Sequence, residues 1–124
     1  MIKEIRTLYP TKIHIAYELT KEEYDSIFDD NKYDEINDMH ESGSDGLTNA
    51  GRNVDKLNCV VMSFDKNYEY DTIIHECYHA ANNIWNFIGA KHDVENDEPF
   101  SYLLSYLSKE CRKFLNEIED GNKD

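Results

Sequence analysis

The pattern of apolar and polar positions predicts two long helices in the second half of the chain. The first begins near Tyr70 or Asp71 and ends near Gly89, a typical residue for a helix terminus. Its apolar positions are Ile73, Cys77, Ala80, Ala81, Ile84 and Ile88. The second helix begins at Glu98 or Pro99, and its tail, residues 119–124, is expected to fray. Its apolar stripe consists of Phe100, Leu103, Leu104, Leu107, Cys111, Phe114, Leu115 and Ile118.

The first half of the chain predicts strands, one short helix and a loop. A helix that follows Thr20 and reaches about residue 30 is indicated by a capping box between Thr20 and Glu23. Polar residues 31–47 contain two glycines and predict a mobile loop. The run 58–64 is so apolar that we expect it to be buried on both faces. The predicted strands are residues 11–18, 47–50 and 58–64.

Composition fits a single domain over residues 1–124 with an α+β fold. The net charge of −13 argues against binding to nucleic acid and against docking on anionic membranes. No signal peptide or membrane-spanning segment is visible, so a cytoplasmic location is expected. The three cysteines are odd in number and lie in apolar patterns, so we expect them to be reduced core residues; they are Cys59, Cys77 and Cys111.

The first predicted helix carries the motif H-E-x-x-H, formed by His75, Glu76 and His79. A spacing of four residues puts both imidazoles on one helical face, where two ring nitrogens can hold one Zn²⁺. Glu76 lies about 100° around the helix and can act as general base on a metal-bound water. The histidines lie opposite the apolar stripe. The alternative is a surface helix on which the two histidines are simply solvated. We also expect His14 and His40 to be solvated.

A zinc site needs a third protein ligand, and the candidates lie downstream in His92, Asp93, Glu95, Asp97 and Glu98. Small residues favour Glu98, because Ser101, Ser105 and Ser108 share its helical face and would let the histidine helix approach closely. The alternatives are Glu95 next, then His92 or Asp97. The alternative to a ligand role is purely structural: Glu98 would then be a first-turn carboxylate that interacts with the helix dipole.

Residues 75–80 and the segment Glu95-Asn96-Asp97-Glu98-Pro99-Phe100-Ser101-Tyr102-Leu103 resemble small gluzincin-type zinc metallopeptidases. In particular, they are similar to short proteins of phages and prophages with an H-E-C-x-H-A core and an E-N-D-E-P-F segment. The resemblance covers about residues 58–108 and implies a minimal zincin-like fold, a small sheet with an active-site helix followed by a glutamate helix. It also implies Glu98 as the third ligand. Metzincins are excluded, because Trp85 stands where they have a histidine.

The expected function is therefore zinc-dependent hydrolysis of peptide bonds, with Zn²⁺ on His75, His79 and Glu98 and a peptide or protein as substrate. In thermolysin-like enzymes an Asp orients a metal-binding histidine, but Tyr102 stands at that position, so an orienting group must come from elsewhere. The alternative is a catalytically inactive zincin-fold phage protein whose acidic surface binds and blocks a host factor. If the chain is phage-encoded, the expected location is the bacterial host cytosol.

Overall fold

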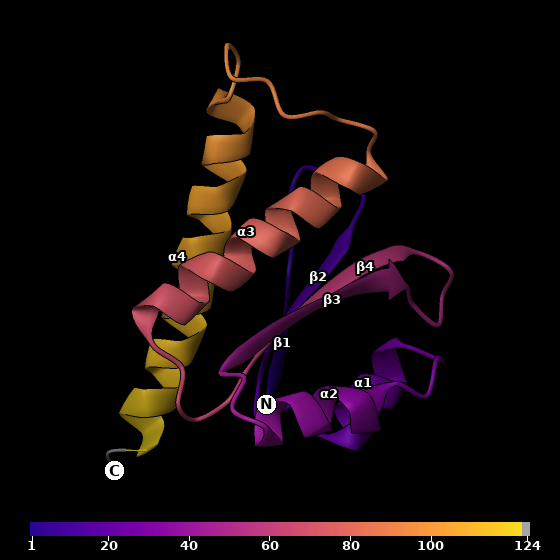
Figure 1. Ribbon diagram of the computed structural model, residues 1–124, viewed down its shortest axis with the longest axis vertical. Coiled ribbons are helices and arrows are strands. Elements are labelled where there is room, and N and C mark those ends of the chain that lie inside the picture. Colours follow the sequence, from indigo (N-terminus) through magenta and orange to yellow (C-terminus); the bar gives the residue numbers. More distant parts are fainter. Residues whose placement is uncertain (123–124) are drawn as a thin grey trace.

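In a computed structural model that describes residues 1–122, the chain forms a four-stranded mixed sheet with two helices on each face (Figure 1). This arrangement is an α+β fold, as the sequence predicted. The elements in chain order are β1 (Ile2–Ile5), β2 (Lys12–Tyr17), α1 (Lys21–Ile27), α2 (Tyr33–Glu41), β3 (Gly46–Arg52), β4 (Asn58–Phe64), α3 (Tyr70–Phe87) and α4 (Glu98–Asn122).

The strand order in the sheet is β1-β2-β4-β3, so β1 and β3 are the edge strands. The two central strands run parallel, and Ile13 of β2 lies opposite Val60 of β4. Each edge strand is antiparallel to its neighbour. A parallel central pair requires a crossover connection, which α1 and α2 provide before the chain returns through β3.

The central strand β4 is buried on both faces, which confirms the prediction from its apolar sequence. Val60 and Met62 point into a large hydrophobic cluster under α3 and α4. Cys59 and Val61 point into a smaller cluster under α1 and α2. The alternation of side chains along a strand explains why one short run of residues serves two separate cores.

Helices α3 and α4 pack against each other and against the sheet through their apolar stripes. At their contact the Sγ atoms of Cys77 and Cys111 are 3.6 Å apart, and Met62 of β4 lies 3.8 Å from Cys111. All three cysteines are buried and free, as expected for reduced core residues. Burial raises the pKa of the Cys59 thiol to about 12.

The prediction of a loop over residues 31–47 is wrong for its central part, because residues 33–41 form α2. The helix buries a single apolar side chain, Ile36, which is too little periodicity to reveal a helix in the sequence. It is also fixed by the hydroxyl of Tyr33, which donates a hydrogen bond to the carbonyl oxygen of Leu19.

The expected fraying from residue 119 is also wrong as far as the described chain goes, because α4 continues to Asn122. Ile118 is buried in the larger cluster, and Glu119 accepts a hydrogen bond from the hydroxyl of Tyr68. Residues 123 and 124 lie outside the described residues. Within residues 1–122 no helix combines the length and the apolar character needed to cross a membrane.

Candidate metal centre

The H-E-x-x-H motif lies in the middle of α3, on a helix with well-defined ends. At its start, Glu69 and Thr72 form a reciprocal capping box in which each side chain accepts a hydrogen bond from the other residue's backbone N–H. The helix ends at Phe87, and Gly89 follows with a φ of 74°, a left-handed conformation that glycine adopts without strain. The apolar stripe faces the sheet and α4, so the opposite face is presented outward.

Both histidines of the motif lie on that outward face and are exposed. Their ring centroids are 4.7 Å apart, and the Nε2 atom of His75 is 3.1 Å from the Nε2 atom of His79. Two nitrogens bound to a tetrahedral zinc at 2.0–2.1 Å would lie about 3.3–3.4 Å apart. The two Nε2 atoms therefore already lie close to the spacing of a zinc-bound pair. In the absence of metal the same distance suits a hydrogen bond between one protonated and one unprotonated nitrogen.

Glu76 is placed differently from the histidines, because its side chain is buried, with 5 % of its surface exposed. It turns toward the edge strand β3, where the hydroxyl of Thr48 lies 2.8 Å from its Oε1 atom and donates a hydrogen bond to it. The same hydroxyl lies 3.2 Å from the backbone carbonyl oxygen of Glu76. A buried carboxylate is costly without such a partner, so Thr48 both compensates the burial and fixes the carboxylate.

The contact between β3 and the motif depends on Gly46, the first residue of β3. A Cβ atom at this position would lie 2.7 Å from Cγ2 of Thr72 and 2.9 Å from Cγ of Glu76. Both distances are too short for carbon atoms, so a side chain here would push the strand away from α3. The sequence analysis missed Gly46 and Thr48, because it placed Gly46 in the predicted loop and not in a strand, where a glycine can mark a close backbone approach.

Of the candidate third ligands, His92 lies next to the histidine face. Its Nε2 atom is 2.6 Å from Oδ1 of Asn82, which follows His79 by three residues and so shares its helical face. The His92 ring is parallel to the ring of Tyr78 at 6.3 Å and meets Phe100 edge-on at 4.6 Å. The connection between α3 and α4 is thereby attached to the outward face of α3.

Glu98 is exposed at the start of α4, where it lines a groove between this helix and the β1–β2 connection that also contains Arg6 and Tyr106. The small-residue face does adjoin α3, since Ser105 and Ser108 line a pocket together with Ile73 and Ile74. Over residues 1–122, however, no three His, Cys, Asp or Glu side chains are grouped as metal ligands. The structure thus brings the two histidines together, but within residues 1–122 it groups none of the candidate third ligands with them, which are His92, Asp93, Glu95, Asp97 and Glu98.

The remaining two histidines were expected to be solvated, and neither is fully so. His40 lies at the end of α2, with Nδ1 2.8 Å from the carbonyl oxygen of Ser44 and Nε2 3.0 Å from Oγ of the buried Ser63. It therefore connects α2 to β4 and is a structural residue. His14 on β2 is half-buried, and this burial lowers its pKa, although the nearby Glu4 carboxylate acts in the opposite direction.

Comparison of the chain with protein-family models, with curated proteins and with solved structures gives no match in any of the three. The chemistry of the site therefore has to be argued from its own residues.

Proposed function

We propose that this protein is a zinc-dependent peptide-bond hydrolase in which His75 and His79 hold the metal and Glu76 is the general base. The observation that carries the proposal is the convergence of the two Nε2 atoms, 3.1 Å apart on an exposed helical face. Neutral imidazole nitrogens are common zinc ligands, and this separation differs from that of two zinc-bound nitrogens by only a few tenths of an ångström, taking about 3.3–3.4 Å for the bound pair. When bound, zinc would supply a Lewis acid that activates water and stabilises negative charge on the carbonyl oxygen.

The surroundings of Glu76 fit a base that must act from a fixed position. Thr48 holds Oε1, so Oε2 is the oxygen left to take a proton from the attacking water and return it to the leaving nitrogen. Glu76 lies within one turn of each histidine along α3, so a single helix carries all three groups. A carboxylate on a rigid element, held by a second side chain, is the arrangement that general-base catalysis requires.

The position of β3 suggests how a peptide would reach the site. β3 is an edge strand, and Thr48, which contacts Glu76, lies on it. An extended peptide can add to such an edge through backbone hydrogen bonds. A peptide bound along β3 would therefore pass beside the carboxylate of Glu76, which supports a peptide as the substrate.

For the third ligand we keep Glu98, the residue that the gluzincin resemblance implies. Its place at the first turn of α4 means that the connection from residue 88 to residue 97 would have to rearrange for the carboxylate to reach the histidines. His92 is the alternative with a structural observation in its favour, since it already contacts Asn82 on the histidine face. In either case the third ligand comes from the segment that follows α3.

The experiment that tests the proposed function combines metal analysis with peptide cleavage. Purified without chelator, the protein should contain about one zinc per chain, and His75→Ala and His79→Ala should each remove it. Glu76→Gln keeps the shape of the side chain and its bond to Thr48, so zinc and fold should be retained. Cleavage of a broad peptide library should be abolished by chelator and reduced on the order of 100-fold or more by Glu76→Gln.

Two results would reject parts of this proposal. Full zinc content in either histidine variant would reject the metal site. Zinc binding by a protein that cleaves no peptide would reject the hydrolase, and the acidic chain would then be a zincin-like binding protein that blocks a basic partner.

A further inference from the structure

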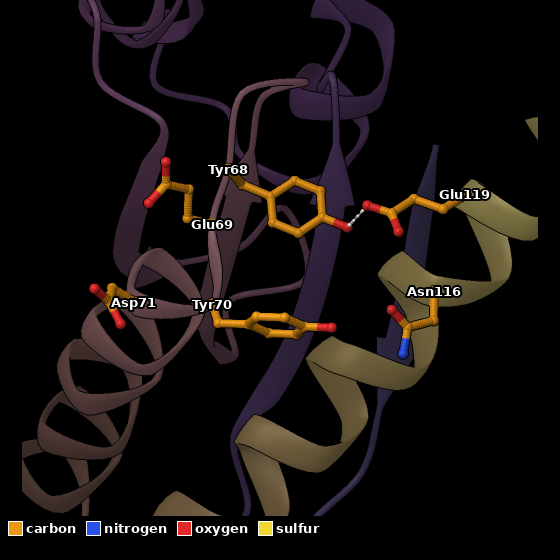
Figure 2. Close-up of a pocket in the computed structure, with 6 residues that line it drawn as sticks. All are labelled: Tyr68, Glu69, Tyr70, Asp71, Asn116 and Glu119. Carbon is orange, nitrogen blue, oxygen red and sulfur yellow. Dashed lines mark hydrogen bonds between the residues drawn. The ribbon is translucent and has the colours of Figure 1, made fainter.

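A second candidate site lies between the start of α3 and the last turns of α4, where two tyrosines line a pocket of about 470 Å³ (Figure 2). Tyr68 lies just before α3 and Tyr70 is its first residue, and both phenol rings extend toward α4 (Figure 2). The lining residues are Tyr68, Glu69, Tyr70, Asp71, Asn116 and Glu119. None of the proposed metal ligands is among them, so this pocket is separate from the metal centre.

Tyr68 is held in place by two aromatic neighbours and one hydrogen bond. Its ring meets Phe64 edge-on at 6.1 Å and Tyr17 edge-on at 6.4 Å, and its hydroxyl donates a hydrogen bond to Oε1 of Glu119. Burial, together with that bond to Glu119, raises the pKa of Tyr68 above its ordinary value. Tyr68 therefore provides a preformed aromatic wall and ties the carboxylate of Glu119 to the same place.

Tyr70 provides a second aromatic wall, and it is open to solvent. It is the first residue of α3, and 72 % of its surface is exposed. An exposed tyrosine beside a pocket presents a ring face whose quadrupole attracts cations. The two rings together thus offer aromatic surface to one occupant of the pocket.

The charge of the lining selects a positive occupant, because it holds three carboxylates and neither lysine nor arginine. The carboxylates do not converge as ligands of a metal ion would. Glu69 accepts the capping hydrogen bond of α3, and Asp71 points away from Glu119 in Figure 2. No cluster of three metal-binding side chains exists in residues 1–122. Aromatic walls with one carboxylate nearby instead suit a larger, weakly hydrated organic cation.

We propose that this pocket binds an organic cation, an ammonium or guanidinium group of the kind that lysine and arginine side chains carry. The cation lies against the faces of Tyr70 and Tyr68, with Glu119 as its counter-charge. Glu119 can serve both partners, since an ionised carboxylate has two oxygens and only one accepts the Tyr68 hydroxyl. The chain's net charge of −13 raises the local concentration of any such cation. The site is independent of zinc and of the proposed hydrolysis.

The test is an NMR titration of the full chain with four small probes. Capped lysine and capped arginine (N-acetyl, N-methylamide) present the two side chains, tetramethylammonium presents a free cation, and capped norleucine is the uncharged control. The three cations should shift the ring signals of Tyr68 and Tyr70 saturably, with a dissociation constant of about millimolar, because cation–π contacts at exposed sites are weak. Norleucine should not. The result should be the same with chelator present.

Matched variants separate the pocket from general effects of charge. Tyr70→Ala should weaken binding about two- to fivefold, the scale of an exposed cation–π contact, whereas Tyr70→Phe, which keeps the ring, should bind like the natural chain. Glu119→Gln should also weaken it, because it removes the charge and keeps an acceptor for Tyr68. Tyr102→Ala is the control, since Tyr102 on α4 is equally exposed at 72 % and lies outside the pocket. Circular dichroism checks that each variant folds.

The outcomes are distinct. Tighter binding of tetramethylammonium than of both capped residues would assign the pocket to a free cation, and the reverse would assign it to a side chain of a peptide; both support the inference. Equal binding of norleucine, unchanged binding in Tyr70→Ala, or no saturable binding of any cation would overturn it.

Discussion

Replacing Gly46 by alanine is the sharpest single perturbation of the site, because this glycine sets the distance between β3 and α3. The added Cβ would lie 2.7 Å from Cγ2 of Thr72 and 2.9 Å from Cγ of Glu76. Both neighbours belong to a packed helix, so they can yield only by moving the helix, the strand or the Glu76 side chain. Overpacking of this kind typically costs about 1–3 kcal/mol in the free energy of unfolding.

For a chain of this length, about 3–5 °C of melting temperature corresponds to each kcal/mol, so Gly46→Ala should melt roughly 3–15 °C lower. The control is Gly51→Ala on the same strand, where the new Cβ would meet only Cε1 of Phe28, at an ordinary 3.8 Å. That variant should be as stable as the natural chain or slightly more stable. Thermal and urea unfolding, followed by circular dichroism, measure both.

A double variant tests the assigned cause. Thr72→Ser removes the methyl group nearest to the new Cβ and keeps the hydroxyl that caps α3. Added to Gly46→Ala, it should restore part of the lost stability, whereas on its own it should change stability little, so the pair should be non-additive. Equal stability of Gly46→Ala and Gly51→Ala would refute the argument that β3 and α3 need a glycine at their contact.

Three further changes probe the site and its support. Glu98→Ala should weaken zinc binding by about 100-fold or more and should do so more strongly than His92→Ala, since loss of a direct ligand exceeds loss of a neighbour; zinc titration against a chromophoric chelator measures both, and the reverse order would give the role to His92. Thr48→Val should destabilise the fold by about 1–3 kcal/mol, because it leaves the buried Glu76 carboxylate without its donor; a melting temperature equal to that of the natural chain would count against this contact. The lowered pKa of His14 means that the unfolded chain takes up a proton at this residue near pH 6.5 before the folded chain does. The contribution of neutral His14 to the free energy of unfolding should therefore be fully present above pH 6.5 and should decrease as the pH drops below it. His14→Gln should show a smaller decrease in stability in unfolding experiments between pH 7 and 5.

The fold was predictable where one pattern decides the local structure. The strands at residues 12–17 and 58–64 and both long helices follow from periodicity, and the capping box after Thr20 places the start of α1. Periodicity was insufficient for α2, which buries only Ile36, and for β1, a four-residue strand that exists because β2 pairs with it. These two elements depend on tertiary contacts, which a local pattern does not contain.

The site divides in the same way. The four-residue spacing of His75 and His79 is enough to predict that their imidazoles meet, and they do. The hydrogen bond between Thr48 and Glu76 joins residues 28 positions apart, and it depends on how closely an edge strand can approach a helix. The third ligand is equally hard to predict from a local pattern, because its position depends on the path of the α3–α4 connection, which has no repeating pattern of its own.

The sheet separates the interior into two unequal cores, and this division has a consequence for local unfolding. Among the residues whose burial the structure describes, 1–121, the core beneath α3 and α4 contains 18 buried residues and the core beneath α1 and α2 contains 8. The helix pair over the smaller core should open at a lower free energy, so its backbone amides should exchange with deuterium sooner than those of α3. An excursion in which α1 and α2 detach would leave the histidine pair on its helix, with α4 and the central strands still packed beneath it. The proposed metal site would then outlast the first stage of unfolding.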